Sequence, residues 1–439
     1  MGRINIVNNA KLRVSCTSLE NLSFVLFFSA DFLRLILGAL LARIDGSSFL
    51  FPVTWGIIYL PLIFSTIIRL SNKKKVNITF IVILILVIGY VFISLELHPN
   101  YLDWYLREDY GIWDTVFRPD KGGIYGFLFF SLCHDENRLY KNFKFIAFMC
   151  FLFVGYQYFQ FLNLGYWLDI NAMGMSVESS YGLTFGYNAS FVACMFFMFY
   201  IKEKKFLYFL LGIISSMLMI LQGSRGAIIV LMFFLLLNYV RKLISKGLVK
   251  AFLFTMILLI LIIFLAMNLS SILSWLSVKL TNVNLSSRTI DAILNNTLFD
   301  DNGRSAIQSL VQEKIQNGPF FGFGIFGDRP LVGPYYYWGY CHNLLLEFQV
   351  DFGKYPGFLF FFILVILSMK VYFKNINNNI DKFLIFILII SFTSKLFLSS
   401  TFWGDKYFWS FLALILYWNN SEKKTGLRHA FIKKRSESI

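Results

Sequence analysis

The sequence predicts an all-α, polytopic integral membrane protein, and three observations carry this prediction. Hydrophobic residues make up 57% of the 439 residues, and charged residues make up only 15%. The mean hydropathy is +0.64. Several apolar stretches reach the roughly 20 residues that an α-helix needs to cross the hydrocarbon core of a membrane. A water-soluble chain of this length would show amphipathic periodicity instead.

Hydropathy indicates about twelve transmembrane helices. The fourth is the weakest, because it is short and begins with Lys121-Gly122-Gly123. The seventh and eighth are separated only by Gly223-Ser224-Arg225-Gly226 and must form a tight hairpin. We place the spans near residues 22–42, 49–70, 76–96, 118–133, 142–162, 183–201, 206–222, 226–240, 250–268, 344–370, 383–400 and 404–419.

The basic residues orient these spans. With a cytoplasmic N-terminus, about 26 of the 40 basic residues fall in cytoplasmic segments, as the positive-inside rule requires. The outer loop at 163–182 carries none. Twelve spans with both termini in the cytoplasm therefore fit. This topology and contact with anionic lipid explain most of the net charge of +15. Nucleic-acid binding is therefore the poorer interpretation.

The spans divide the chain into three regions. Residues 1–268 hold the first nine helices, residues 269–343 form a large outer loop, and residues 344–439 hold the last three helices and a basic cytoplasmic tail. Connections between helices usually take only a few residues. A polar, glycine-rich loop of about 75 residues therefore indicates chemistry or recognition.

Several kinds of chemistry leave no trace in the sequence. The five cysteines show no CxxC spacing, so neither a disulfide framework nor a metal site is expected. The chain has no P-loop and no Asp-rich metal-binding motif. The first apolar stretch is too long for a signal peptide and lacks a small-residue cleavage site. We expect no cofactor and no metal.

Aromatic and acidic residues are interleaved in the outer loop at about 97–120. Aromatic rings stack on the C–H faces of sugars and carboxylates accept hydrogen bonds from their hydroxyls, so this loop suits a glycan. The simpler interpretation is an interfacial belt, where Trp and Tyr commonly lie. The residues concerned are Asp103, Trp104, Tyr105, Arg107, Glu108, Asp109, Tyr110, Trp113 and Asp114.

The large loop contains a predicted helix followed by a glycine-rich turn. Asn302 is a suitable N-cap, and a stop follows at Gly318-Pro319. The turn contains glycines that would let the backbone approach a ligand closely. Apolar residues at helical spacing are Ile307, Leu310, Val311 and Ile315, and the glycines are Gly322, Gly324 and Gly327.

Three residues are assigned to the same outer face: Arg225 at the end of the seventh span, Arg304 in the loop helix, and His342 before the tenth span. Each has an ordinary alternative as a snorkelling or interfacial side chain. Together they suit the transfer of a sugar from a lipid diphosphate. The arginines would neutralise the diphosphate and the histidine would take a proton from the attacking hydroxyl, without a metal.

Ser224-Arg225-Gly226, Asn302-Gly303-Arg304, the turn at 319–324 and His342-Asn343 with Gly353 resemble, in order and spacing, the O-antigen ligase/polymerase superfamily. The resemblance covers mainly residues 220–360. It implies about twelve spans in a bacterial inner membrane, with a large periplasmic loop late in the chain. It also implies that Arg225 and Arg304 bind the diphosphate of an undecaprenyl-linked glycan and that His342 activates the acceptor hydroxyl. One departure is Lys354, where the family tends to have an apolar residue.

Two functions compete within this family. A polymerase of O-antigen or capsule joins lipid-linked repeat units, whereas a ligase transfers the finished glycan to the lipid A core. We favour the polymerase, because the loop at 97–120 could bind a specific glycan acceptor. The expected partners are an undecaprenyl-diphosphate-linked oligosaccharide, membrane lipids and a chain-length regulator. Further candidates for substrate binding are Arg288, Arg329 and Asn343.

A transporter or flippase for lipid-linked sugars is a third interpretation. Asp31 and Arg34 in the first span and Lys395 in the eleventh are charges of the kind that line a transport path. The alternative for Asp31 and Arg34 is a mutual i,i+3 pair. Transporters usually contain internal repeats, and the two halves of this chain show no self-similarity, which favours the enzyme.

Overall fold

The computed structural model describes most of the chain. The described residues are 15–41, 43, 46–72, 78–170, 176–179, 182–222, 225–246, 274–275, 277–278, 290, 294–295, 303–335 and 339–419. The ninth predicted span, at 250–268, and the basic tail beyond residue 419 lie outside them.

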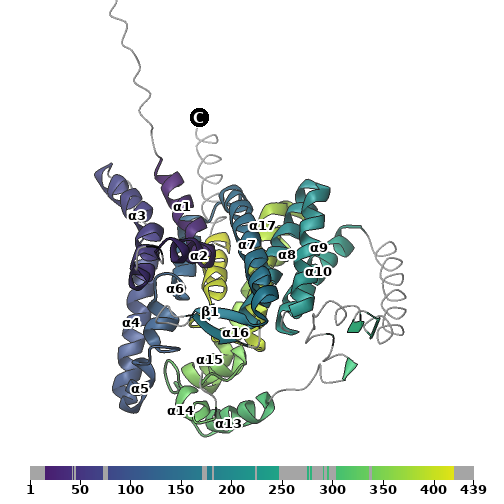
Figure 1. The fold of residues 1–439 in the computed structure, drawn as a ribbon. Coiled ribbons are helices and arrows are strands. Elements are labelled where there is room, and N and C mark those ends of the chain that lie inside the picture. The colour runs from purple at the N-terminus through teal and green to yellow at the C-terminus, as the bar shows by residue number, and fades with distance from the viewer. Residues whose placement is uncertain are drawn as a thin grey trace, which may run out of the picture.

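The described part of the chain is helical apart from one short hairpin, as predicted for an all-α membrane protein (Figure 1). Strands β1 (Trp167–Ile170) and β2 (Ser176–Ser179) pair antiparallel. The first helices are α1 (Cys16–Phe28), α2 (Ala30–Leu41), η2 (Ser47–Phe49), α3 (Leu50–Ser71), α4 (Thr79–Leu97), η3 (Pro99–Tyr101), α5 (Leu102–Tyr105), η4 (Trp113–Phe117), α6 (Ile124–Leu132) and α7 (Glu136–Leu164). The later ones are α8 (Leu183–Glu203), α9 (Phe206–Gln222), α10 (Arg225–Lys246), α13 (Arg304–Gln316), α14 (Arg329–Val332), α15 (Leu344–Phe352), α16 (Lys354–Asn378), α17 (Ile380–Thr393), η5 (Ser394–Phe397) and a last helix at 406–419.

Among the described residues, six helices are long and apolar enough to cross a membrane, or seven if α1 and α2 are one bent span. The six lie in α3, α4, α7, α8, α10 and α16. The polytopic class is confirmed, whereas the count of twelve stays a prediction. The fourth predicted span, at 118–133, contains only the nine-residue α6.

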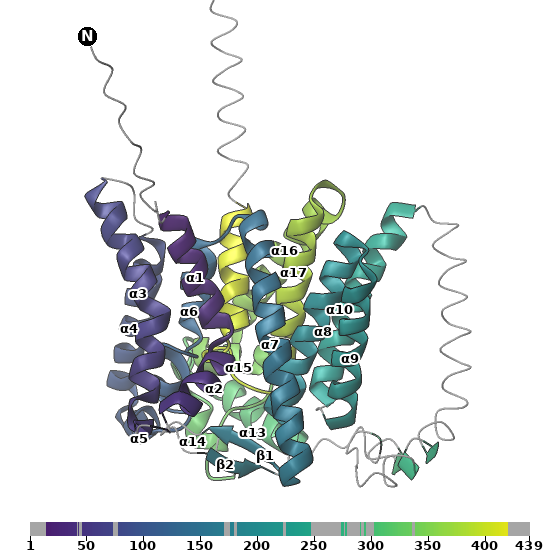
Figure 2. The same ribbon diagram turned by 45° about the horizontal axis from the view of Figure 1, so that its top comes forward.

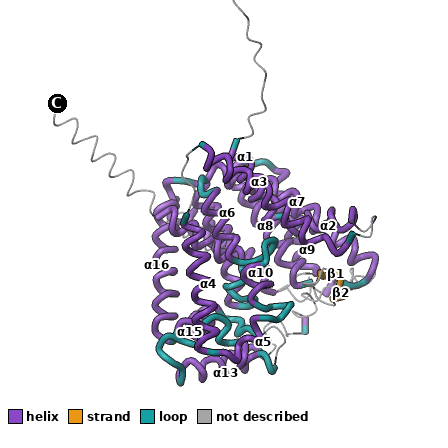
Figure 3. Tube along the Cα trace, turned by 90° about the vertical axis from the view of Figure 1, so that its left-hand side faces the viewer, coloured by secondary structure: helices purple, strands orange, loops and turns teal. Residues whose placement is uncertain are grey.

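The long helices run side by side, and the shorter elements gather at one end of the bundle (Figure 2). We call this end, where α5, α13, α14 and the β1–β2 hairpin lie, the site end. A side view places α13 and α15 at the same end, close to the loops that join them (Figure 3). The first described residues of α1 lie at the opposite end.

Helix α8 forms the centre of the bundle. In its most apolar stretch, 72% of the residues are buried, and it contacts α7, α9, α10 and α17. Phenylalanines fill much of the space between helices, often edge to face. Phe191 of α8, for example, meets Phe392 of α17 at 4.9 Å between ring centroids. Such pairs add to the stabilisation that burial alone gives.

The tenth predicted span, 344–370, is not one continuous helix. It divides into α15 and α16 at Gly353, which has φ 99° and ψ 154°. A Cβ at this position would overlap the carbonyl oxygen of Phe320. The backbone amides of Phe323 and Gly324 donate to the last carbonyls of α15, at 2.8 and 3.0 Å. The break therefore lets the glycine-rich turn cap the end of α15.

This arrangement predicts that Gly353→Ala destabilises the protein by about 2 kcal/mol or more, because it combines a forbidden φ with a clash. The matched control is Gly155→Ala in α7, where a Cβ would meet nothing. The control should gain up to about 1 kcal/mol from helix propensity. Thermal unfolding of the purified proteins in detergent checks both, and equal unfolding temperatures would contradict the assigned break.

Candidate functional site

Helix α13 places Arg304 at the site end. The predicted amphipathic helix is confirmed, because Ile307, Val311 and Ile315 are buried against Cys341 and residues of α15. Its first residue is Arg304, and its N-cap is Gly303 with φ 80°, one residue later than the expected cap Asn302. Glycine adopts this left-handed conformation without strain. Asn302 itself lies outside the described residues.

His342 lies directly before α15 and is 8% exposed. Its φ of 56° is in the left-handed region, which costs a non-glycine residue about 1–3 kcal/mol and often marks functional positions. Its ring stands edge-on to Tyr340, 4.5 Å between centroids. A hydrogen bond to the backbone of Leu398 fixes the imidazole further.

The surroundings keep His342 neutral. Burial is the largest cause that lowers the pKa of its imidazole, and the positive charge of Arg304 is the next. Arg329 lowers it further, whereas the hydrogen bond to Leu398 acts in the opposite direction, and the resulting pKa is about 4. At neutral pH the imidazole therefore carries no charge and can accept a proton. The effect of Arg304 also places its charge within electrostatic range of His342.

Asn343 has a structural task in addition to any role in binding. Its side-chain oxygen accepts hydrogen bonds from Leu345 N at 3.0 Å and Leu346 N at 3.2 Å. It is thus the N-cap of α15. The cap fixes the start of the helix beside His342.

Arg329 is not directed to solvent. It is 1% exposed and its Nη1 lies 3.0 Å from Asp328 Oδ1. The guanidinium also stands over Phe326, 4.5 Å from the ring centroid. Asp328 Oδ2 accepts a hydrogen bond from Cys341 N at 2.9 Å. Arg329 therefore neutralises a buried carboxylate next to the segment that carries His342.

Arg225 and Arg288 are the remaining predicted binding residues. Helix α10 begins at Arg225, but the side chain of Arg225 and the whole of Arg288 lie outside the described residues. A Cβ on Gly226 would overlap the hydroxyl of Tyr187. A larger residue in place of Gly226 would therefore have to displace the Tyr187 hydroxyl, where α10 lies against α8.

Sequence reasoning missed two buried carboxylates on α15. Asp351 accepts hydrogen bonds from Trp403 Nε1 at 2.6 Å and Gly327 N at 3.1 Å. Glu347 accepts from Phe402 N at 3.1 Å and from the hydroxyl of Thr401. The signal was two acids four residues apart inside an apolar predicted span, which places them on one helix face. They join α15 to the loop before the last helix.

The glycine-rich turn approaches the chain itself rather than open space. Gly322 and Gly324 have φ 75° and 77°. A Cβ on Gly322 would overlap the backbone at Gly353, and one on Gly324 would overlap Ser94. Ser94 Oγ also accepts a hydrogen bond from Ile325 N at 3.0 Å. These two glycines are therefore required by contacts within the chain, and the close approach of a ligand to this turn stays a prediction.

The loop at 97–120 packs on the large loop. Cβ atoms on Gly333 and Gly339 would meet the ring of Trp104, and Tyr105 donates to Ile325 O at 2.9 Å. Arg107 stands 4.0 Å over the Trp104 ring. Trp113 is 53% exposed. The loop thus borders the segment that leads to His342.

The three intramembrane charges that the sequence analysis singled out, Asp31, Arg34 and Lys395, are in ion pairs. Arg34 forms ion pairs with Asp31 and Asp120, so the i,i+3 alternative for Asp31 and Arg34 is confirmed. Lys395 lies 2.6 Å from Asp405. No three His, Cys, Asp or Glu side chains in the described part of the chain are grouped to hold a metal ion.

The fold and the placement of Arg304 and His342 define a polytopic membrane protein with a polar site at one end of its bundle. Residues 210–362, from α9 to α16, match the family model described as O-antigen ligase. This segment contains Arg225, Arg304 and His342, and it places this part of the chain in the O-antigen ligase/polymerase superfamily, whose members are glycosyltransferase-like enzymes. No curated protein and no solved structure matches the chain.

The buried pair predicts that Asp328→Asn costs about 3–5 kcal/mol, because it removes the carboxylate that forms the ion pair with the buried Arg329. The double variant with Arg329→Met should recover part of this loss. The control is Asp103→Asn, which changes an exposed carboxylate. Denaturant unfolding measures all three, and a single variant as stable as the control would contradict the structural role of the pair.

Proposed function

We propose that the protein is an O-antigen or surface-polysaccharide polymerase that joins undecaprenyl-diphosphate-linked repeat units by glycosyl transfer. The observation that carries the proposal is the pairing of a cation at the start of α13 with a neutral, buried imidazole before α15. Both lie within the segment that matches the O-antigen ligase family.

The reaction assigns one task to each residue. A hydroxyl of the acceptor sugar attacks the anomeric carbon of the donor, and His342 takes the hydroxyl proton as general base. The bond from the anomeric carbon to the phosphate oxygen breaks, and the lipid diphosphate leaves with the electron pair. Arg304 and Arg225 stabilise the negative charge that develops on the diphosphate. Direct attack inverts the anomeric centre, and the step requires neither metal nor cofactor.

The pKa of His342 supports its role as general base beside the arginines. A histidine with a pKa of about 4 is almost wholly in its basic form at neutral pH. It is also a weak base until a dianionic diphosphate binds beside Arg304. The bound negative charge would raise the pKa of His342 toward neutrality, where general-base catalysis is most efficient. Base strength and donor binding would thus be coupled.

The membrane arrangement follows from the same proposal. The site end would face the periplasm of a bacterial inner membrane, and both termini would lie in the cytoplasm. The positive-inside distribution supports this orientation. Lipid-linked glycan could then reach the site laterally from the outer leaflet, and a chain-length regulator would be a further partner.

The polymerase is preferred because of the loop at 97–120. Trp104 packs against Gly333 and Gly339, so the aromatic–acidic loop borders the segment that ends at His342. Such a loop can position a glycan acceptor specific to one repeat unit. The second candidate is a ligase that transfers the glycan to lipid A core, which the description of the matching family model favours. A flippase is less well supported, since Asp31, Arg34 and Lys395 are all in ion pairs.

Deleting the gene and separating the surface polysaccharide on a gel tests the proposal. A polymerase predicts a single repeat unit on the lipid core, with the ladder lost. Bare core with long chains still on undecaprenyl diphosphate would indicate the ligase. Survival of both long chains and attachment would overturn the enzyme assignment.

Two substitutions test the site. His342→Asn keeps a residue that tolerates a left-handed φ and should lower transfer by about 10²–10⁴-fold without loss of folding. Arg304→Ala should have a comparable effect, because one such donor is worth about 10²–10³-fold. The control is Lys314→Ala, an exposed basic residue in the last turn of α13. Transfer is measured in membranes with lipid-linked substrate, and wild-type turnover by both variants would refute the assignment.

The pH dependence provides a separate test. Because the pKa of His342 is lowered to about 4 in the free protein, kcat/KM should stay flat from pH 8 to pH 5. It should fall only as pH approaches 4, where the imidazole becomes protonated. An ordinary histidine would give an acidic limb near 6.5. A limb at that value, absent in His342→Asn, would contradict the buried environment described above.

A further inference from the structure

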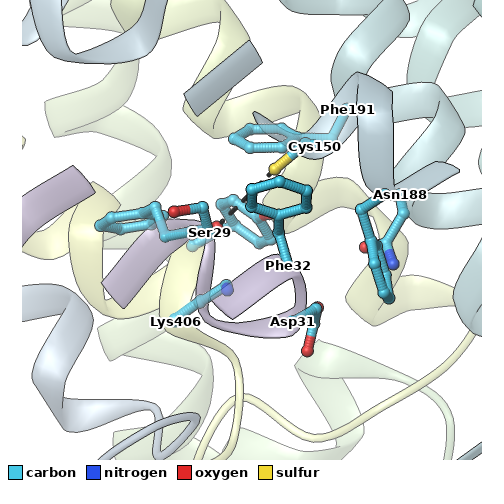
Figure 4. A pocket seen from close by; sticks show the side chains of 10 residues that line it. Ser29, Asp31, Phe32, Cys150, Asn188, Phe191 and Lys406 are labelled. Carbon is cyan, nitrogen blue, oxygen red and sulfur yellow. Dashed lines mark hydrogen bonds between the residues drawn. The ribbon is translucent and has the colours of Figure 1, made fainter. Parts of the chain in front are cut away.

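A small cavity lies where α1 gives way to α2. The two helices meet at an angle of 80° around Ser29, so the chain leaves its helical path inside the bundle. Asp31 lines the cavity from α2, Asn188 from α8 and Lys406 from the last helix (Figure 4). These are three polar side chains from separate elements around one space.

The charges near this cavity do not balance. Five basic residues stand against four acidic ones, and four of the five basic residues are in ion pairs. Lys406 is the exception, since it makes no ion pair with any described residue. The pairs are Arg34 with Asp31 and Asp120, Arg118 with Asp114 and Asp120, Lys121 with Asp114, and Lys395 with Asp405.

Lys406 instead has aromatic neighbours. Its ammonium nitrogen lies 5.4 Å from the ring centroid of Phe28, 5.6 Å from that of Phe27 and 5.7 Å from that of Tyr407. These distances give weak cation–π attraction at most. An unpaired cation inside a membrane bundle is unfavourable and commonly marks a binding site.

A second donor in the cavity has no partner. Asn188 Nδ2 is buried and donates no hydrogen bond to any described residue. Asp31, which also lines the cavity, is engaged by Arg34. The cavity therefore presents an ammonium that forms no ion pair with a described residue, although the charge of Asp31 acts on it, and an amide N–H group without an acceptor. A ligand that satisfies both must be an acceptor, and an ammonium without an ion pair of its own favours an anion.

The walls indicate where this anion comes from. Phe28, Phe32 and Phe191 line the same cavity, and α2 beside it exposes apolar side chains such as Leu40, which is 53% exposed. In a membrane such a surface faces lipid. We propose that the cavity binds a phosphate group of an isoprenoid phosphate lipid, with Lys406 and Asn188 as donors and the aromatic walls against the isoprenoid chain.

This inference rests on the proposed polymerase function and extends it. A polymerase holds two lipid diphosphates at once, one on the donor and one on the acceptor, so a single cationic set beside His342 is insufficient. The cavity would hold the second lipid. Because it is small, the flexible stem of Lys406 and the ring of Phe32 must shift to admit the phosphate group.

The test is a binding measurement on the full-length protein in nanodiscs of phosphatidylcholine, with undecaprenyl phosphate as the probe and native mass spectrometry as the readout. Lys406→Gln should weaken binding about tenfold or more, and Asn188→Ala should weaken it less. Lys406→Arg keeps the charge and should bind within about threefold of wild type. The control is Lys370→Gln, an exposed lysine of α16, which should not change affinity.

Each outcome is decisive. Equal affinity of Lys406→Gln and Lys370→Gln would overturn the site. If Lys406→Gln does not fold, Asn188→Ala carries the test, because it removes a donor and keeps the charge. Inorganic phosphate should compete only at concentrations far above that of the lipid. If it binds as tightly as the lipid and depends equally on Lys406, the ligand is free phosphate and the lipid assignment is wrong.

Failure of the proposed function would look different. If the His342 and Arg304 variants transfer glycan as well as the wild type, the polymerase assignment is overturned. Lipid binding that depends on Lys406 could still be observed in that case. Conversely, if transfer requires His342 but lipid affinity is unchanged by substitution of Lys406, only the second lipid site is overturned.

Discussion

The fixed position of α15 is the constraint on which the site depends. The helix is bounded by two residues with positive φ, His342 at 56° and Gly353 at 99°. Its buried Glu347 and Asp351 accept hydrogen bonds from the loop before the last helix. Neither end of α15 can shift without breaking buried hydrogen bonds, which is costly in a low-dielectric interior. The backbone at both ends of α15 and the buried carboxylates on one face of it therefore fix the position of His342.

Charged side chains are arranged differently near α2 and at the site end. Near α2, basic and acidic side chains are paired, and Lys406 alone lacks a partner among the described residues. At the site end, Arg329 neutralises Asp328, while Arg304 adds its charge to the field at His342. A pre-set positive field next to a neutral imidazole suits an anionic leaving group, because little reorganisation is needed when charge develops.

Local patterns made much of the fold and part of the site predictable. Apolar stretches predicted the long helices, and the spacing of Ile307, Val311 and Ile315 predicted α13. The bend at Ser29 was not predictable, because a serine fits within a helix and its surroundings come from distant segments. The burial of Arg329 was also missed, because its contacts with Phe326 and Tyr340 depend on the path of an irregular loop. The partners of Asp351, Gly327 and Trp403, lie 24 and 52 residues away.

The contacts of Asp351 also bear on how the protein matures. Tyr90 of α4 donates to its backbone oxygen at 2.6 Å, and Trp403 donates to its carboxylate at 2.6 Å. Residues made early and late in synthesis therefore meet at a single position. The site would remain incomplete in a nascent chain until the last helix has entered the membrane. Under the proposed function, lipid-linked precursors would thus be protected from a partly assembled polymerase, with no separate inhibitor required.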